Sequence, residues 1–96
     1  MFEPTGPRSA GNGEGVHVEI RSRHAILYRD KDRTLVVRHD LGKSDNQYIA
    51  YIELPKGWAI PAGAMLEGPE REIVSAHLTD ALRAIDLKVE FARPGD

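Results

Sequence analysis

The alternation of apolar and polar positions predicts five strands and one helix along this chain. Between residues 16 and 21, Val16, Val18 and Ile20 fall on one side and charged or polar residues fall on the other, which is typical of a half-buried strand. Four further runs have strand character, at residues 25–29, 34–38, 48–54 and 87–91. The run at 48–54 is the most apolar of them, so we expect it to lie inside the sheet.

One amphipathic helix is predicted between the fourth strand and the last. Pro69 suits the first helical position, because a missing N–H costs little there. Asp86 is expected to end the helix in a left-handed conformation, which aspartate tolerates better than most residues. Such a helix is too short to be stable alone in water and must pack on the sheet. Its apolar stripe recurs at helical spacing and consists of Val74, Leu78, Ala81, Leu82 and Ile85, extended by Ile73.

These elements, in the order ββββαβ, predict the fold class α+β. We expect a mainly antiparallel sheet of about five strands, with the amphipathic helix packed on one face. Residues 16–92 are predicted to form a single α+β domain, followed by a short tail at residues 93–96. Residues 1–15 are predicted to be a flexible N-terminal arm, because glycine and proline are frequent there and Phe2 is its sizeable apolar side chain.

Two polar connections are candidate contact sites for a partner. Residues 30–32 have the length and polarity of a hairpin turn, and residues 40–46 form a longer polar loop around Gly42. Trp58 either plugs the open end of the core or stands at an interface, where tryptophan is a frequent hot spot. The plug is the preferred interpretation. The candidate partner-binding residues are Asp30, Asp32, Arg33, Asp40, Lys43, Asp45 and Trp58.

No pattern typical of a catalytic or metal site stands out. The chain has no cysteine, and none of its four histidines lies at the i, i+4 spacing of a helical zinc site. His17 and His24 could meet across the first hairpin, which favours a surface pair over a ligand set. His77 is expected at the boundary of the helix stripe. We therefore expect neither enzymatic activity nor a bound cofactor or metal ion.

Composition disfavours two classes of partner. The 96 residues carry 13 Lys and Arg against 15 Asp and Glu, whereas a nucleic-acid binder of this size usually has a basic excess. No apolar run approaches the ~20 residues that span a bilayer, so we expect no membrane contact. The absence of cysteine fits a reducing compartment, and a cytoplasmic location is expected.

The succession of short motifs resembles the immunity protein 74 family of bacterial polymorphic toxin and contact-dependent inhibition systems. The motifs are His17-Val18-Glu19-Ile20-Arg21, residues 28–35, Tyr48-Ile49-Ala50-Tyr51-Ile52, Trp58 with Pro61, and Ala81-Leu82 followed by residues 87–91. The resemblance covers residues 16–91. Two positions depart from the family: residues 62–64 read Ala-Gly-Ala instead of a more polar, acidic segment, and Asp86 stands where glycine is usual.

The resemblance implies an immunity protein that binds a cognate toxin domain in the bacterial cytoplasm and neutralises it by stoichiometric occlusion. It implies no catalytic residues. Two alternatives stay open from the residues themselves. One is a small ligand-binding or enzymatic α+β domain with a pocket between the helix and the Trp58 loop. The other is a homo-oligomeric adaptor that pairs through a sheet edge. The oligomeric state is left open.

Overall fold

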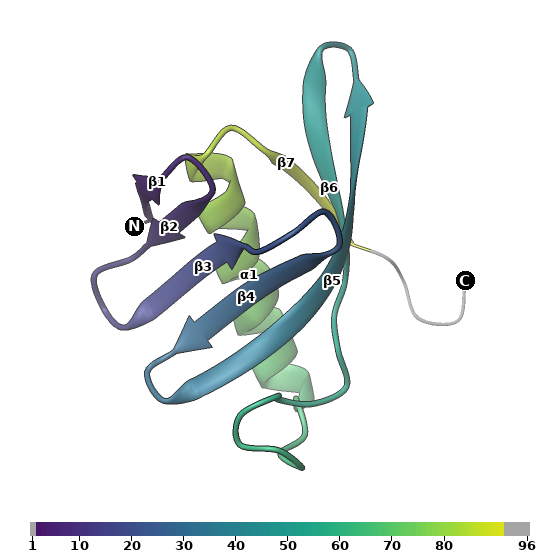
Figure 1. Cartoon of the computed structure of the whole chain (residues 1–96). Coiled ribbons are helices and arrows are strands. Elements are labelled where there is room, and N and C mark those ends of the chain that lie inside the picture. Colours follow the sequence, from purple (N-terminus) through teal and green to yellow (C-terminus); the bar gives the residue numbers. More distant parts are fainter. Residues whose placement is uncertain (1, 92–96) are drawn as a thin grey trace.

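A computed structural model describes residues 2–91 as one sheet with one helix on it (Figure 1). The fold class α+β is confirmed, and the sheet is mostly antiparallel, but it has seven strands instead of about five. The elements in chain order are β1(Glu3–Gly6), β2(Ser9–Gly11), β3(Val16–Ile20), β4(Ala25–Asp30), β5(Arg33–Ser44), β6(Gln47–Glu53), α1(Gly68–Ala84) and β7(Lys88–Phe91).

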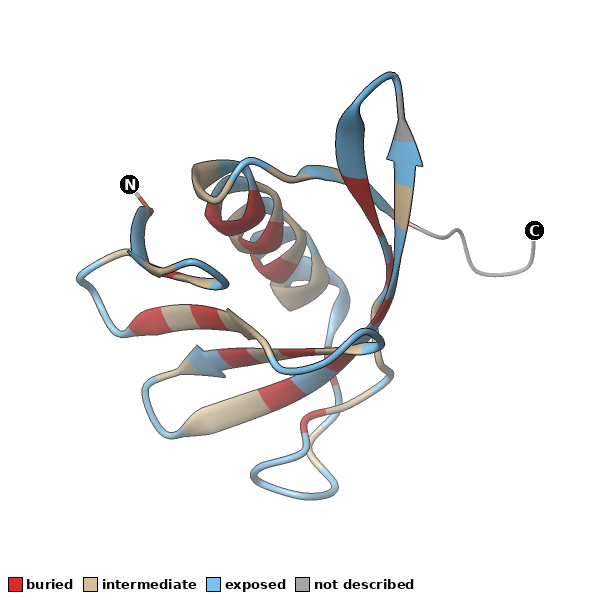
Figure 2. Cartoon of the chain, turned by 45° about the horizontal axis from the view of Figure 1, so that its top comes forward, coloured by how far each residue is buried: buried red, intermediate tan, exposed pale blue. Residues whose placement is uncertain are grey.

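The strands lie in the sheet in the same order as in the sequence. β1 to β6 form an antiparallel meander, and β7 joins β6 in parallel. A parallel neighbour requires a crossover, and α1 supplies it. The sheet curls, so that α1 contacts β1, β2 and β3 near one edge and β7 at the other (Figures 1 and 2). One helix therefore closes the concave face.

The prediction of a flexible arm at residues 1–15 is wrong for the part that the structure describes. β1 pairs with β2, and β2 pairs with β3, which places Ala10 opposite Val18. The side chains of Phe2 and Ala10 are buried in the core, and the Phe2 ring meets His77 edge to face at 5.6 Å. The glycines serve a turn: Gly13 and Gly15 have φ of 74° and 99° between β2 and β3. The predicted tail at 93–96 lies outside the described residues.

The predicted loop at residues 40–46 is also wrong. β5 runs on to Ser44 and pairs with β6 along this whole stretch, as in the pairs Leu41–Ala50 and Lys43–Tyr48. Only Asp45 and Asn46 form the turn, both with positive φ (50° and 67°), as a two-residue type I′ hairpin requires. The predicted turn after Asp30, by contrast, is confirmed between β4 and β5.

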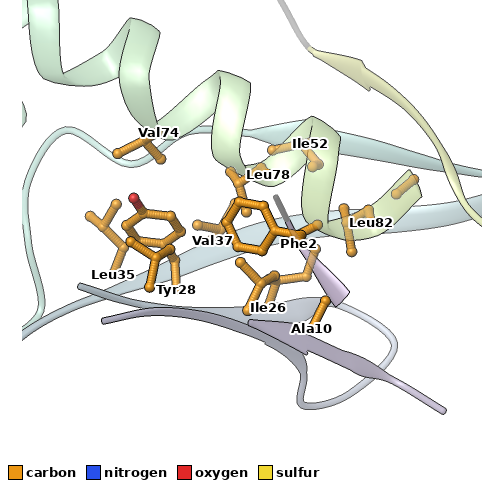
Figure 3. Packing of buried hydrophobic residues seen from close by; sticks show 14 of the residues in the cluster. Phe2, Ala10, Ile26, Tyr28, Leu35, Val37, Ile52, Val74, Leu78 and Leu82 are labelled. Carbon is orange, nitrogen blue, oxygen red and sulfur yellow. The ribbon is translucent and has the colours of Figure 1, made fainter. Parts of the chain in front are cut away.

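The core lies between α1 and the concave face of the sheet (Figure 3). The predicted helix stripe is confirmed for Val74, Leu78, Ala81 and Leu82, which are buried, and for Ile85, which is partly buried. Its predicted extension to Ile73 is wrong, because that side chain is 55% exposed. Asp86 ends the helix in the left-handed region (φ 66°), as predicted. The stripe packs on side chains of the central strands, among them Ile26, Tyr28, Leu35, Val37 and Ile52.

Trp58 closes one end of this core. It is 5% exposed, and its ring lies 6.3 Å from that of Tyr28, so its predicted role as a plug is confirmed. The segment around it is held by main-chain bonds. The Trp58 N–H donates to the Ala64 carbonyl (2.8 Å), and the Thr34 N–H donates to the Ile60 carbonyl (2.9 Å).

The buried N-terminal segment leads to a stability prediction. We expect Phe2→Ala to lower the free energy of unfolding by about 3 kcal/mol, because a large buried ring is lost and a cavity remains. Urea denaturation followed by circular dichroism measures the change. Glu3→Ala, at the neighbouring exposed position, is the control and should leave the curve unchanged. Coincident curves for Phe2→Ala and wild type would contradict the packing of this segment in the core.

Candidate interaction surfaces at the two ends of strand β5

The predicted partner-binding residues fall into two groups at opposite ends of β5. Asp30, Asp32 and Arg33 lie at its start, whereas Asp40, Lys43 and Asp45 lie toward its other end and the turn beyond it. A strand of 12 residues spans roughly 36 Å at about 3.3 Å per residue. An ordinary interface of ~800 Å² per partner is therefore centred on one group or the other.

At the first end, Arg33 is occupied by contacts within the protein. Its Nη1 donates to Glu70 Oε2 at 2.7 Å, and its Nη2 lies 3.6 Å from Asp30 Oδ2. The guanidinium also stacks over the Trp58 ring, 4.2 Å from the centroid. We call Asp30, Arg33, Trp58 and Glu70 the Arg33 cluster. It joins the first turn of α1 to the sheet and to the loop that precedes the helix.

The charges of the Arg33 cluster stabilise each other. The hydrogen bond from Arg33 is the largest cause that lowers the pKa of Glu70, and the same bond raises the pKa of Arg33. The buried Trp58 Nε1 makes no well-formed hydrogen bond among the described residues, although it lies close enough to Glu70 to help lower that pKa. These side chains are therefore engaged in structure, and of the residues predicted at this end Asp32 is the one that is exposed without a side-chain partner in residues 2–91.

Tyr28 lies beside the Arg33 cluster and belongs to the core. Burial, followed by the charge of Asp30, raises its pKa to about 12, so the phenol is neutral and can donate. Its hydroxyl lies 2.7 Å from Nδ1 of His77 and forms a hydrogen bond with it. His77 thus stands at the boundary of the helix stripe, as predicted, half-buried and in contact with the core.

The second end of β5 is different, because the hairpin β5–β6 projects past the rest of the sheet (Figure 1). Unlike the Arg33 cluster, it carries large apolar side chains that are exposed: Leu41 is 45% exposed and Tyr48 is 55% exposed. Lys43 Nζ lies 5.7 Å from the centroid of the Tyr48 ring. Asp45, exposed in the turn, ends the hairpin. Here aromatic, apolar and charged groups all face solvent.

The outer face of this hairpin, turned away from α1, borders a polar hollow of about 250 Å³. Register places Arg38 opposite Glu53 and Asp40 opposite Tyr51 on that face. His24 Nδ1 lies 2.9 Å from Asp40 Oδ1, with both side chains at least three-quarters exposed. We call these five side chains the polar hollow. Tyr51 also covers Gly42, where a Cβ would come within 2.7 Å of the ring, so a larger residue would displace it.

The predicted pairing of His17 with His24 is wrong. His17 lies opposite Arg29 in the sheet, and its Nε2 is 3.1 Å from the Thr5 hydroxyl, whereas His24 faces Asp40. Sequence reasoning missed His39, which is 2% exposed. Its Nε2–H donates to the Ser22 carbonyl (2.9 Å), while Nδ1 is buried without a partner among the described residues. In the sequence, His39 continues the alternation of Leu35 and Val37, and this pattern could have indicated that its side chain is buried.

A second hollow of about 250 Å³ lies at the other side of the hairpin, beyond the end of α1. Its apolar walls are Ile20, Leu41, Ile85 and Leu87, and Arg8 and Arg23 also line it. We call these six side chains the basic groove. Sequence reasoning missed its arginines because they come from two separate turns, before β2 and before β4.

Among the described residues, neither hollow has the side chains needed to bind a metal ion. Within residues 2–91, no group of three or more histidine and carboxylate side chains could hold a metal ion. The proposed pocket between the helix and the Trp58 loop is occupied by Trp58 itself. In the described part of the chain, no helix has the length and apolar character needed to traverse a bilayer. The geometry at the hairpin offers contact groups for a partner.

Comparison with known proteins adds no relative to this picture. The chain matches no protein-family model, and it shows no significant similarity to a curated protein or to a solved structure. Membership of the immunity protein family therefore stays a prediction.

The Arg33–Glu70 bond predicts a pH-dependent stability. Because the folded pKa of Glu70 is lowered, its contribution is complete above the ordinary value of 4.5 and is lost as the pH falls through the lower folded pKa. We expect Glu70→Gln to reduce the urea midpoint of unfolding at pH 7. Near pH 3, the midpoint of the variant should approach that of the wild type. Glu72→Gln, exposed in the same turn, should show no such convergence. A constant difference between Glu70→Gln and wild type at all pH values would contradict a charge origin.

Proposed function

We propose that this protein is a binding module whose hairpin β5–β6 docks on a partner protein, and that the partner is a toxin domain neutralised by occlusion. The single observation that carries the docking site is the exposure of Leu41 and Tyr48 on a hairpin that extends beyond the sheet. The toxin as partner comes from the family resemblance of residues 16–91.

The composition of the hairpin supports binding. Tyrosine is enriched at interface cores because its ring buries a large area at low entropic cost while its hydroxyl still forms hydrogen bonds. Tyr48 and Tyr51 provide two such side chains on opposite faces of β6. Lys43 and Asp45 beside them supply charge at the rim, where it mainly affects the association rate.

A sheet-edge adaptor is less well supported. The edge strand β1 has only four residues and includes Pro4, which cannot donate to a new strand. The opposite edge, β7, also has four residues and carries exposed Lys88 and Glu90. Short, charged or proline-bearing edges are typical of proteins that avoid edge-to-edge pairing.

A ligand-binding or enzymatic domain is the second candidate, and the polar hollow is the observation that favours it. His24 and Asp40 form an acid–base pair beside Arg38 and Glu53. Both members of the pair are open to water, however, and a reaction gains most from groups that are shielded from it. Binding of a protein surface supplies such shielding from the partner, so we favour docking.

Co-expression tests the function directly. A candidate toxin domain, the C-terminal domain of a large protein encoded by an adjacent gene, is expressed alone and together with this protein, and we expect growth only in the second case. Equal killing in both cultures would refute neutralisation.

Charge reversal then locates the surface. We expect Asp45→Lys to weaken the complex about tenfold in calorimetry while leaving the melting temperature nearly unchanged. Asp45→Asn retains the left-handed turn and separates the loss of charge from a disturbed hairpin. Glu14→Lys, exposed in the β2–β3 turn, makes the same change of charge as a control. Loss of affinity with Asp32→Lys in place of Asp45→Lys would move the interface to the opposite end of β5.

A further inference from the structure

We propose that the basic groove receives one large apolar side chain of the partner together with a carboxylate that lies next to it. This inference rests on the proposed function and states which chemistry the partner presents. The groove adjoins the hairpin through Leu41, so a protein docked on the hairpin also reaches the groove.

The apolar part of the groove lies where the sheet continues past the end of α1. Leu41 shares its face of the sheet with Val37 and His39, which are both buried. The helix ends at Ala84, and Leu41 is left 45% exposed beyond it. Ile85 and Leu87, which follow the helix, form the facing wall and are themselves partly buried against the core. The result is an apolar strip that this chain does not cover.

The charge of the groove indicates that its occupant also carries a carboxylate. Arg8 and Arg23 are exposed, and neither forms an ion pair with a described residue. The turn of Arg8 is held in place, since its carbonyl accepts the Ile20 N–H at 2.8 Å. Three acidic residues, Glu19, Asp40 and Asp86, are adjacent in sequence to the apolar walls, and none of them is among the residues that line the groove. Two unpaired guanidinium groups on a protein of net charge -2 favour a carboxylate.

The size of the groove favours side chains over a free ligand. Its volume of about 250 Å³ is below the ~300–1,000 Å³ of typical small-molecule pockets. It is large enough for one or two side chains, and apolar anchors that fill such pockets are frequent hot spots. We therefore assign the groove to an apolar–acidic pair of residues on the partner's surface.

Nuclear magnetic resonance titration tests the chemistry of the groove without a partner. Hexanoate, the probe, combines an apolar chain with a carboxylate. At millimolar concentration we expect it to shift the amide signals of Ile20, Leu41 and Leu87. Hexylammonium, with the opposite charge, should not. The double variant Arg8→Glu/Arg23→Glu and the variant Leu41→Ser should each lose the response, while Arg29→Glu, exposed on the outer face, should retain it. Equal shifts with both probes, or shifts that survive the double variant, would overturn the inference.

The same variants in the complex separate this inference from the proposed function. We expect Arg8→Glu/Arg23→Glu to weaken the toxin-domain complex at least about tenfold, and Arg29→Glu to leave it unchanged. Full affinity of the double variant would refute the groove while the docking function stands. Failure of the wild-type protein to bind the toxin domain would refute the proposed function, and the assignment of the groove to this partner would fall with it. Hexanoate that stays bound in the complex would likewise count against that assignment.

Discussion

The structure depends on one constraint: a single helix must cover the concave face of a curled seven-stranded sheet. The parallel pairing of β6 and β7 requires the crossover that places α1 there, and the curl brings β1 and β2 to the same helix. The hairpin β5–β6 projects past the rest of the sheet (Figure 1), and its side chains Leu41 and Tyr48 face solvent.

The two ends of the helix differ in the polar and apolar groups that they leave exposed. At its start, Arg33 forms an ion pair with Glu70 and stacks over the ring of Trp58. At its end, the chain turns through Asp86 into β7 without a comparable polar network among the described residues. The closed end stabilises the fold, and the open end leaves apolar and basic groups available for contact. This asymmetry is the reason for locating recognition at the hairpin.

Local periodicity was sufficient to predict the helix stripe apart from Ile73, the β3–β4 and β4–β5 hairpins and the last strand. It failed for β1 and β2, because their glycine and proline content indicated an arm, and only pairing with β3 and burial of Phe2 stabilise them. The hairpin was missed because residues 40–46 are polar, although Leu41 continued the alternation. Asp40, Lys43 and Asp45 were identified correctly as exposed, whereas Arg8 and Arg23 converge only through the curl of the sheet.

The two sides of the hairpin also differ in what they can accept. The outer side presents His24, Asp40 and Glu53 to water, while the side facing α1 presents Leu41 between two arginines. A partner that encloses the hairpin must match acceptors and donors on one side and an apolar, acidic surface on the other. A protein with the reverse pattern would bury unpaired charges, which costs several kcal/mol by general estimates. Because specificity is a difference between such costs, the opposed chemistry of the two sides can distinguish one cognate partner from related ones.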